Sequence, residues 1–227
     1  MKKQQLDHVL RAAGRITGER QFIIIGSQSL HGKYPDLADE ILRSAEVDLI
    51  AGNDSKRTEW LNAIGHLSPF HETFGYYADP VDASTATLPR GWKGRLVHLA
   101  PGETDGVRGL CLEPHDLAVA KYAAGRDKDL IFTRELARRA LVSEERLLSL
   151  LDQTQLDESV RSRIREQITA DFHAAAGRDP VRERAEWLKL RREAQAGTAT
   201  PKPTRAGKRS KRIERDSGTG VDDAADD

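Results

Sequence analysis

Two carboxylates stand two positions apart in a short apolar segment that runs from Glu46 to Ile50. In a strand, Glu46 and Asp48 would share one face while Val47 and Leu49 point to the other. Two like charges repel, which is tolerated at a solvated edge or where a divalent cation lies between them. Because Mg²⁺ binds a few carboxylates together with substrate phosphate oxygens, the pattern fits a metal-dependent phosphoryl or nucleotidyl transfer site. The alternative is an ordinary exposed strand face.

A glycine-serine pair follows the β-branched run from Phe22 to Ile25. That run predicts a buried strand, and Gly26 predicts a tight turn at its end. Ser27 would then start a helical segment whose backbone N–H groups could face a phosphate, or it would only cap that segment. Ser44, just before the carboxylate strand, joins Gly26 and Ser27 as a candidate for nucleotide binding.

A lysine lies on the apolar face of a helix predicted to begin at Pro114. Leu117, Ala120, Lys121 and Ala124 fall at positions i, i+3, i+4 and i+7. A lysine on this stripe is costly unless it meets a negative charge, which a nucleotide phosphate or the carboxylate cluster would supply. Alternatively, its long side chain extends past the small alanines to solvent.

An aspartate follows at the start of the next predicted helix, because Gly125 should end the preceding one. Acids in a first turn complement the helix dipole without any further function. Asp129, however, also begins an apolar stripe that continues to Ala140, so it should point inward. We therefore expect Asp129 to pair with Lys121 or Arg126.

The order of these motifs resembles a known fold. A strand ending in Gly26-Ser27, followed by the acid-x-acid strand, is similar to the nucleotidyltransferase fold of the DNA polymerase beta type. Lys121 with the Arg126-to-Asp129 segment resembles the Lys and Arg-x-Lys-Asp signature of AbiEii-related nucleotidyltransferase toxins and their uncharacterised relatives. The resemblance spans residues 22 to 136. It departs from the common pattern at Glu46, where Asp is usual, and in a longer spacer after Ser27.

The resemblance implies an enzyme that transfers a nucleotide from an NTP to an acceptor, RNA such as a tRNA end. It further implies a toxin or phage-defence protein with a cognate antitoxin as partner. Glu46 and Asp48 would hold Mg²⁺ or Mn²⁺, and Asp79, Asp82 or neither would supply a third carboxylate. The implied catalytic residues are Glu46, Asp48, Lys121 and Asp129, and the implied nucleotide-binding residues are Gly26, Ser27, Ser44, Lys121 and Arg126.

Two other functions remain open. One is a catalytically inactive nucleotide-binding or regulatory protein on the same fold. The other is a structural interaction protein that uses its charged C-terminal helices, although this would not explain an inward-facing Lys121.

Composition bounds these hypotheses. The chain has 227 residues with 36 acids and 36 Lys or Arg, so no overall field steers it toward nucleic acid. The single cysteine, Cys111, excludes an internal disulfide and a cysteine-rich metal site, and its apolar neighbours predict a buried side chain. Without an apolar leader or a membrane-length segment, we expect a soluble cytoplasmic protein with no membrane partner.

The fold class expected is α/β, a mixed nucleotidyltransferase-like sheet with flanking helices, then a helical C-terminal part and a disordered tail. The aromatic-rich segment from Phe70 to Tyr77 predicts a strand, with His71 and Glu72 available to line a cleft. Trp92 would cover a sheet edge or stack on a base. The predicted divisions are 1–108, the nucleotidyltransferase-like core; 109–196, the helical region with the Lys and Arg-x-Lys-Asp motif; and 197–227, the tail.

Overall fold

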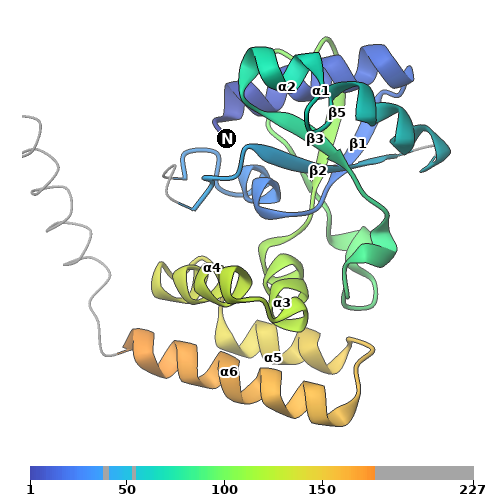
Figure 1. Cartoon of the computed structure of the whole chain (residues 1–227). Helices are drawn as coiled ribbons and strands as arrows, with labels where there is room; N and C mark the ends of the chain where they lie inside the picture. The colour runs from blue at the N-terminus through green and yellow to red at the C-terminus, as the bar shows by residue number, and fades with distance from the viewer. Residues whose placement is uncertain (38–40, 53–54, 177–227) are drawn as a thin grey trace, which may run out of the picture. The chain divides into compact units, whose positions relative to one another are not determined.

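The computed structural model describes residues 1–37, 41–52 and 55–176. The predicted tail, the helix expected near residues 181–194 and part of the short helix expected at 35–42 lie outside the described residues. Figure 1 labels the main elements. In chain order they are α1 (Lys3–Thr17), β1 (Gln21–Ile24), η1 (Ser27–Gly32), β2 (Glu46–Ala51), η2 (Ser55–Ile64), α2 (Pro69–Phe74), β3 (Tyr77–Pro80), η3 (Ala83–Thr85), η4 (Trp92–Arg95), β4 (Val97–His98), β5 (Arg108–Cys111), α3 (Pro114–Ala124), α4 (Asp127–Arg138), α5 (Glu144–Asp152) and α6 (Glu158–Ala176), where η denotes a 3₁₀ helix.

The strands form one mixed sheet with the order β3-β2-β1-β5-β4. β1 runs antiparallel to β2 and parallel to β5, while β2 and β3 are parallel. The chain returns from β2 through η2 and α2 to β3, so helical segments connect the two parallel strands. The mixed α/β fold class is thus confirmed, and β5 lies across the predicted division at residue 108.

The two sides of the sheet contribute to different hydrophobic cores, and in this view α1 and α2 lie above β2 while α3 to α6 lie below it (Figure 1). Phe22 and Ile24 of β1, with Val47 and Leu49 of β2, are fully buried in one core with α1 and η2. Ile25 and the helices α3 to α6 form a second core. The alternation in β2 therefore turns Glu46 and Asp48 away from α1, as predicted. Both carboxylates lie on the sheet face that the helical part approaches.

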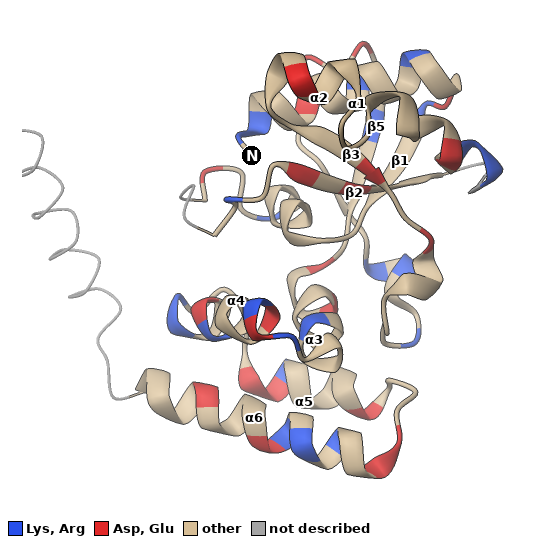
Figure 2. Ribbon diagram, viewed as in Figure 1, with Lys and Arg blue, Asp and Glu red and all other residues tan. Residues whose placement is uncertain are grey.

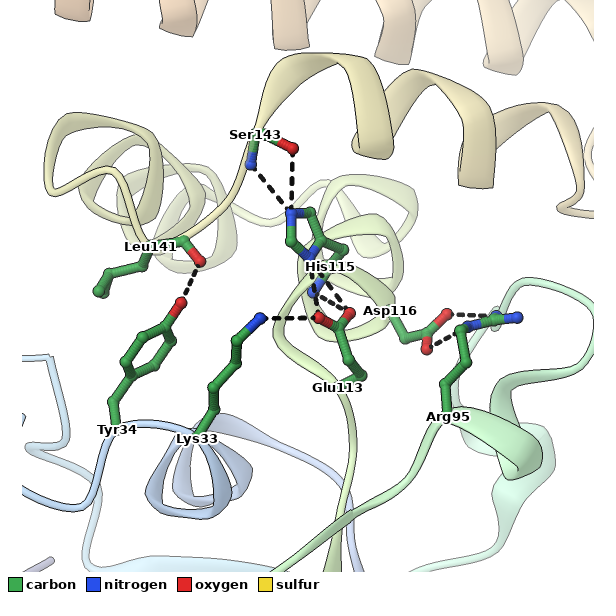
Figure 3. Close-up of polar contacts among 8 residues, drawn as sticks. All are labelled: Lys33, Tyr34, Arg95, Glu113, His115, Asp116, Leu141 and Ser143. Atoms are coloured by element: carbon green, nitrogen blue, oxygen red, sulfur yellow. Dashed lines mark hydrogen bonds and ion pairs between the residues drawn. The ribbon is translucent and has the colours of Figure 1, made fainter.

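Polar contacts tie the sheet to the helical part (Figure 3). The Arg95 guanidinium donates two hydrogen bonds, of 2.9 and 2.6 Å, to the fully buried Asp116 carboxylate on α3. Glu113 caps α3 by accepting a 2.8 Å hydrogen bond from the His115 backbone N–H. His115 Nε2 in turn accepts a 2.9 Å hydrogen bond from the Ser143 backbone N–H. These contacts fix the start of α3, the helix that carries Lys121.

A tyrosine adds one more contact between the two parts. The Tyr34 hydroxyl, just after η1, donates a 2.6 Å hydrogen bond to the Leu141 carbonyl. We expect Tyr34→Phe to lower the free energy of unfolding by about 1 kcal/mol, because it removes one hydrogen bond and keeps the ring. Urea unfolding measures this difference. A variant as stable as the wild type would show that the bond contributes nothing.

The segment from Phe70 to Tyr77 differs from the sequence-based prediction. It forms helix α2 followed by β3, so the expected continuous strand is wrong. Ser68 caps α2 by accepting a hydrogen bond from the His71 N–H, Pro69 occupies the first turn, and Gly75 ends the helix in a left-handed conformation. These local signals outweighed the β-propensity of the aromatic residues. In the part of the chain described, no helix combines the length and apolar character needed to cross a membrane.

Candidate active site

Three carboxylates line up across two neighbouring strands. Asp48 of β2 pairs in register with Asp79 of β3, and Glu46 pairs with Tyr77 two residues earlier. Because parallel neighbours in register project to the same face, Asp79 joins Glu46 and Asp48. The Tyr77 hydroxyl donates a 3.1 Å hydrogen bond to Glu46 Oε2. Strand register thus brings Asp79 to the carboxylates, which the sequence alone left open.

The carboxylates affect one another's titration. Burial, reinforced by the Glu46 charge, raises the pKa of Asp48 to about 6, while Lys121 opposes this shift. Burial and Glu46 also raise the pKa of Asp79. Burial and the bond to Glu46 raise the pKa of Tyr77 to about 12. Such crowded negative charge favours a bound cation or proton.

The turn after β1 fits closely around one of these acids. A Cβ added to Gly26 would lie 1.6 Å from Asp48 Oδ2 and 2.8 Å from its Cγ. The missing side chain of Gly26 therefore leaves the space that the Asp48 carboxylate occupies.

We expect Gly26→Ala to displace the Asp48 carboxylate and to lower the free energy of unfolding by about 1–3 kcal/mol. Gly94→Ala is the matched control, because a Cβ there meets nothing within 4 Å. Thermal melts compare the two variants. Equal stability of both would contradict the close fit of Gly26 against Asp48.

A cation pair faces the carboxylates from the helical part. Lys121 Nζ, on α3, donates a 2.8 Å hydrogen bond to Asp129 Oδ1, and Arg126 Nε lies 2.5 Å from Asp129 Oδ2. Asp129 is only 1% exposed, so the predicted inward orientation and pairing are confirmed. Burial raises its pKa, but the hydrogen bonds from Arg126 and Lys121 outweigh burial and hold the pKa below its usual value. Asp129 thus holds both cations in place.

A cleft of about 170 Å³ lies between Asp48 and the two cations, and Glu46, Asp79 and Asp129 are not among the residues that line it. Gly26 and Asp48 line it from the sheet, and Lys121 and Arg126 line it from the helical part. Figure 2 shows acidic residues on β2 and β3, whereas α4 carries acidic and basic residues side by side. A water molecule occupies about 30 Å³ in the liquid, so the cleft has room for a group of several heavy atoms.

The donor set fits a hard divalent cation. Among the described residues, no three His, Cys, Asp or Glu side chains are close enough to form a complete metal site by themselves. Mg²⁺, however, is usually held by one or two carboxylates with substrate phosphate oxygens and water filling the other positions. Glu46 and Asp48, with Asp79 beside them, supply that kind of partial oxygen set next to a cleft with two cations.

Other predicted residues lie elsewhere. Gly26, not Ser27, occupies the cap position of η1, and neither Ser27 nor Ser44 is among the residues that line the cleft. The Ser44 hydroxyl instead accepts a 3.2 Å hydrogen bond from the Glu46 N–H. Asp82 is an exposed turn residue whose carboxylate caps η3, so of the two candidates only Asp79 joins the site. Trp92 packs against the helical core.

Cys111 is fully buried, as expected, and burial raises the pKa of its thiol to about 12.

Tyr77 was not anticipated as a site residue. Its place opposite Glu46 depends on the pairing of β2 with β3, which no local pattern in the sequence encodes.

Comparison with known proteins identifies a family. A family model described as "Nucleotidyltransferase of unknown function (DUF6036)" matches residues 4–176. No curated protein and no solved structure shows significant similarity to the chain. The matched range contains every residue of the cleft. It also contains the three aligned carboxylates, Glu46, Asp48 and Asp79, which we call the carboxylate row.

Proposed function

Because the chain belongs to a family of nucleotidyltransferases of unknown function, we propose that it transfers a nucleotide from an NTP to an acceptor hydroxyl with the help of Mg²⁺ or Mn²⁺. The use of a metal-bound NTP in this proposal rests on one observation. The same cleft is lined by Asp48 on the sheet and by Lys121 and Arg126 on the helical part. Anionic oxygens on one side and cations on the other suit a metal-bound triphosphate.

The residues divide the chemistry between them. The acceptor oxygen attacks the α-phosphorus, the bond from that phosphorus to the bridging oxygen breaks, and pyrophosphate leaves. Lys121 and Arg126 stabilise the negative charge on the phosphates, while Asp129 keeps both side chains directed at the cleft. Asp79, whose raised pKa makes it a better base than an ordinary aspartate, is placed to accept the acceptor's proton. A cation held by Glu46 and Asp48 would supply charge neutralisation.

We further propose RNA, such as a tRNA end, as the acceptor, and a toxin or phage-defence role with a cognate antitoxin. The support for these is the resemblance of the Lys121 and Arg126-to-Asp129 segment to the AbiEii-related toxins.

Labelled nucleotides test the proposal directly. Purified protein is incubated with Mg²⁺, total RNA and an NTP labelled at either the α- or the γ-phosphate. Transfer of the α-label to RNA, with no transfer of the γ-label, is the expected result. Lys93→Ala, at an exposed lysine outside the motif and outside the cleft lining, serves as a control that should retain transfer. Mg²⁺-dependent NTP binding without transfer to any acceptor would instead indicate the inactive nucleotide-binding protein.

A further inference from the structure

A cluster of rings lies beside the carboxylates and outside the cleft that Lys121 lines. The Tyr77 ring centroid is 4.5 Å from that of His71 and 5.2 Å from that of His66, and the two histidine rings are 5.2 Å apart. Tyr77 also donates its hydroxyl hydrogen bond to Glu46. The ring cluster therefore begins at the carboxylate row itself.

The backbone of this cluster is strained. Leu67, between the two histidine positions, has a φ of 60°, and the residue is 72% exposed. A bulky residue rarely adopts positive φ, and an apolar side chain gains nothing from facing water. The Leu67 N–H donates a 3.1 Å hydrogen bond to His71 Nδ1, so neutral His71 carries its proton on Nε2. The loop thus presents an apolar side chain, ring faces and an N–H donor together.

The contacts place this cluster on one side of the carboxylates. Asp48 lines the cleft together with Lys121, whereas Glu46 pairs with Tyr77, whose ring contacts both histidines. Figure 1 shows the same arrangement of elements, with α2 and α3 on opposite sides of β2 in this view. If the phosphates of the nucleotide bind at Lys121, the ring cluster remains accessible to the second substrate, which is the acceptor.

We propose that His66, Leu67, His71 and Tyr77 form a stacking subsite for the terminal base of a nucleic-acid acceptor. The inference rests on the proposed function, since it names the chemistry of the acceptor for the same site. A base stacked here would bring the attached sugar hydroxyl toward Glu46 and Asp79. The ring nitrogens favour a heteroaromatic base with polar edges over the phenol ring of a protein tyrosine.

Binding without turnover tests the subsite. The probe is a single-stranded RNA pentanucleotide with 2-aminopurine at its 3′ end, and the reference is the same RNA with an abasic 3′ end. Quenching of 2-aminopurine fluorescence gives the affinity for the base-tipped RNA, and competition gives the affinity for the abasic RNA. Both are measured with Mg²⁺ and without NTP. We expect the double variant His66→Ala/His71→Ala to bind the base-tipped RNA about ten-fold or more weakly and to bind ATP as the wild type does.

Two further variants separate recognition from folding. Phe74→Ala is the matched control, because this exposed ring on the same helix contacts His8, Phe70 and Tyr76 instead of the subsite. It should leave RNA affinity unchanged. Leu67→Gly relieves the positive φ, so it should bind RNA more weakly without a fall in melting temperature.

Several results would overturn the proposal. One is that the wild type binds base-tipped and abasic RNA with equal affinity. A second is that the double variant loses as much affinity for ATP as for RNA. A third is that a tyrosine peptide, and not the unlabelled RNA, displaces the probe. If wild-type protein fails to bind ATP yet shows base-dependent RNA binding that needs both histidines, the proposed function fails and the subsite stands.

Discussion

The Asp48→Asn variant is expected to lose nucleotidyl transfer while gaining thermodynamic stability. Asparagine keeps the shape of the side chain but removes a charge from the carboxylate row, so a metal-bound triphosphate is held less well. Charge stabilisation by a bound metal contributes several kcal/mol to such reactions, so turnover should fall roughly a hundred- to thousand-fold. The assay is the α-label transfer, with NTP affinity in Mg²⁺ measured by calorimetry.

The gain in stability depends on pH in a defined direction. Burial and Glu46 raise the pKa of Asp48 from 3.8 to about 6, so the native protein holds this proton more tightly than the unfolded chain does. The free energy of unfolding therefore falls as pH rises from about 4 to about 6. Above that range the ionised carboxylate costs about 2–3 kcal/mol, which the variant should recover. Near pH 4 the two proteins should be equally stable.

The matched control for this experiment is Asp82→Asn. Asp82 is an exposed aspartate outside the cleft, so its loss should leave transfer intact and should not reproduce the pH-dependent gain. If Asp48→Asn is no more stable than wild type at neutral pH, the carboxylate row is not crowded as described.

Local patterns predicted the parts of the site that each depend on a single element. The two-residue period of β2 placed Glu46 and Asp48 on one face, and helical spacing placed Lys121 toward the cleft. Gly125, with a φ of 64°, ends α3 as expected. In each case one element's geometry is enough to determine which way the side chain points.

Features that depend on contacts between distant segments were not predictable. Asp79 joins the row only because β3 pairs with β2 in one particular register. The bond from Arg95 to the buried Asp116 joins a 3₁₀ turn to a helix 21 residues later. Both contacts follow from three-dimensional packing, which sequence spacing does not specify. The α2 helix was missed for a local reason, because the β-propensity of its aromatic residues concealed the cap at Ser68.

The Lys121→Ala variant is expected to separate nucleotide recognition from folding. Lys121 is 20% exposed at its side chain, lines the cleft and is held by Asp129 at 2.8 Å. If its ammonium meets the triphosphate, the variant loses a charge-assisted contact of roughly 1.5–3 kcal/mol, on the order of ten- to a hundred-fold in nucleotide affinity. Calorimetric titration with NTP and Mg²⁺ measures this loss.

Stability should respond differently to the two members of the pair. After Lys121→Ala, Arg126 still bonds Asp129, so the buried carboxylate keeps one partner and the free energy of unfolding should fall by less than about 1 kcal/mol. Asp129→Asn instead leaves two cations without their shared anion, and we expect a loss of about 1–3 kcal/mol together with weaker nucleotide binding. Because its acid pKa is lowered in the native state, the stability that Asp129 contributes should disappear as pH falls below about 4.

The combination of results identifies the role of Lys121. Weaker nucleotide binding with nearly unchanged stability supports a phosphate contact, and this is the result we expect. Marked destabilisation with normal nucleotide affinity would show that Lys121 serves only to neutralise Asp129 between α3 and α4. If neither quantity changes, the side chain simply reaches solvent past the small residues of its helix, and the triphosphate site must then rely on Arg126 alone.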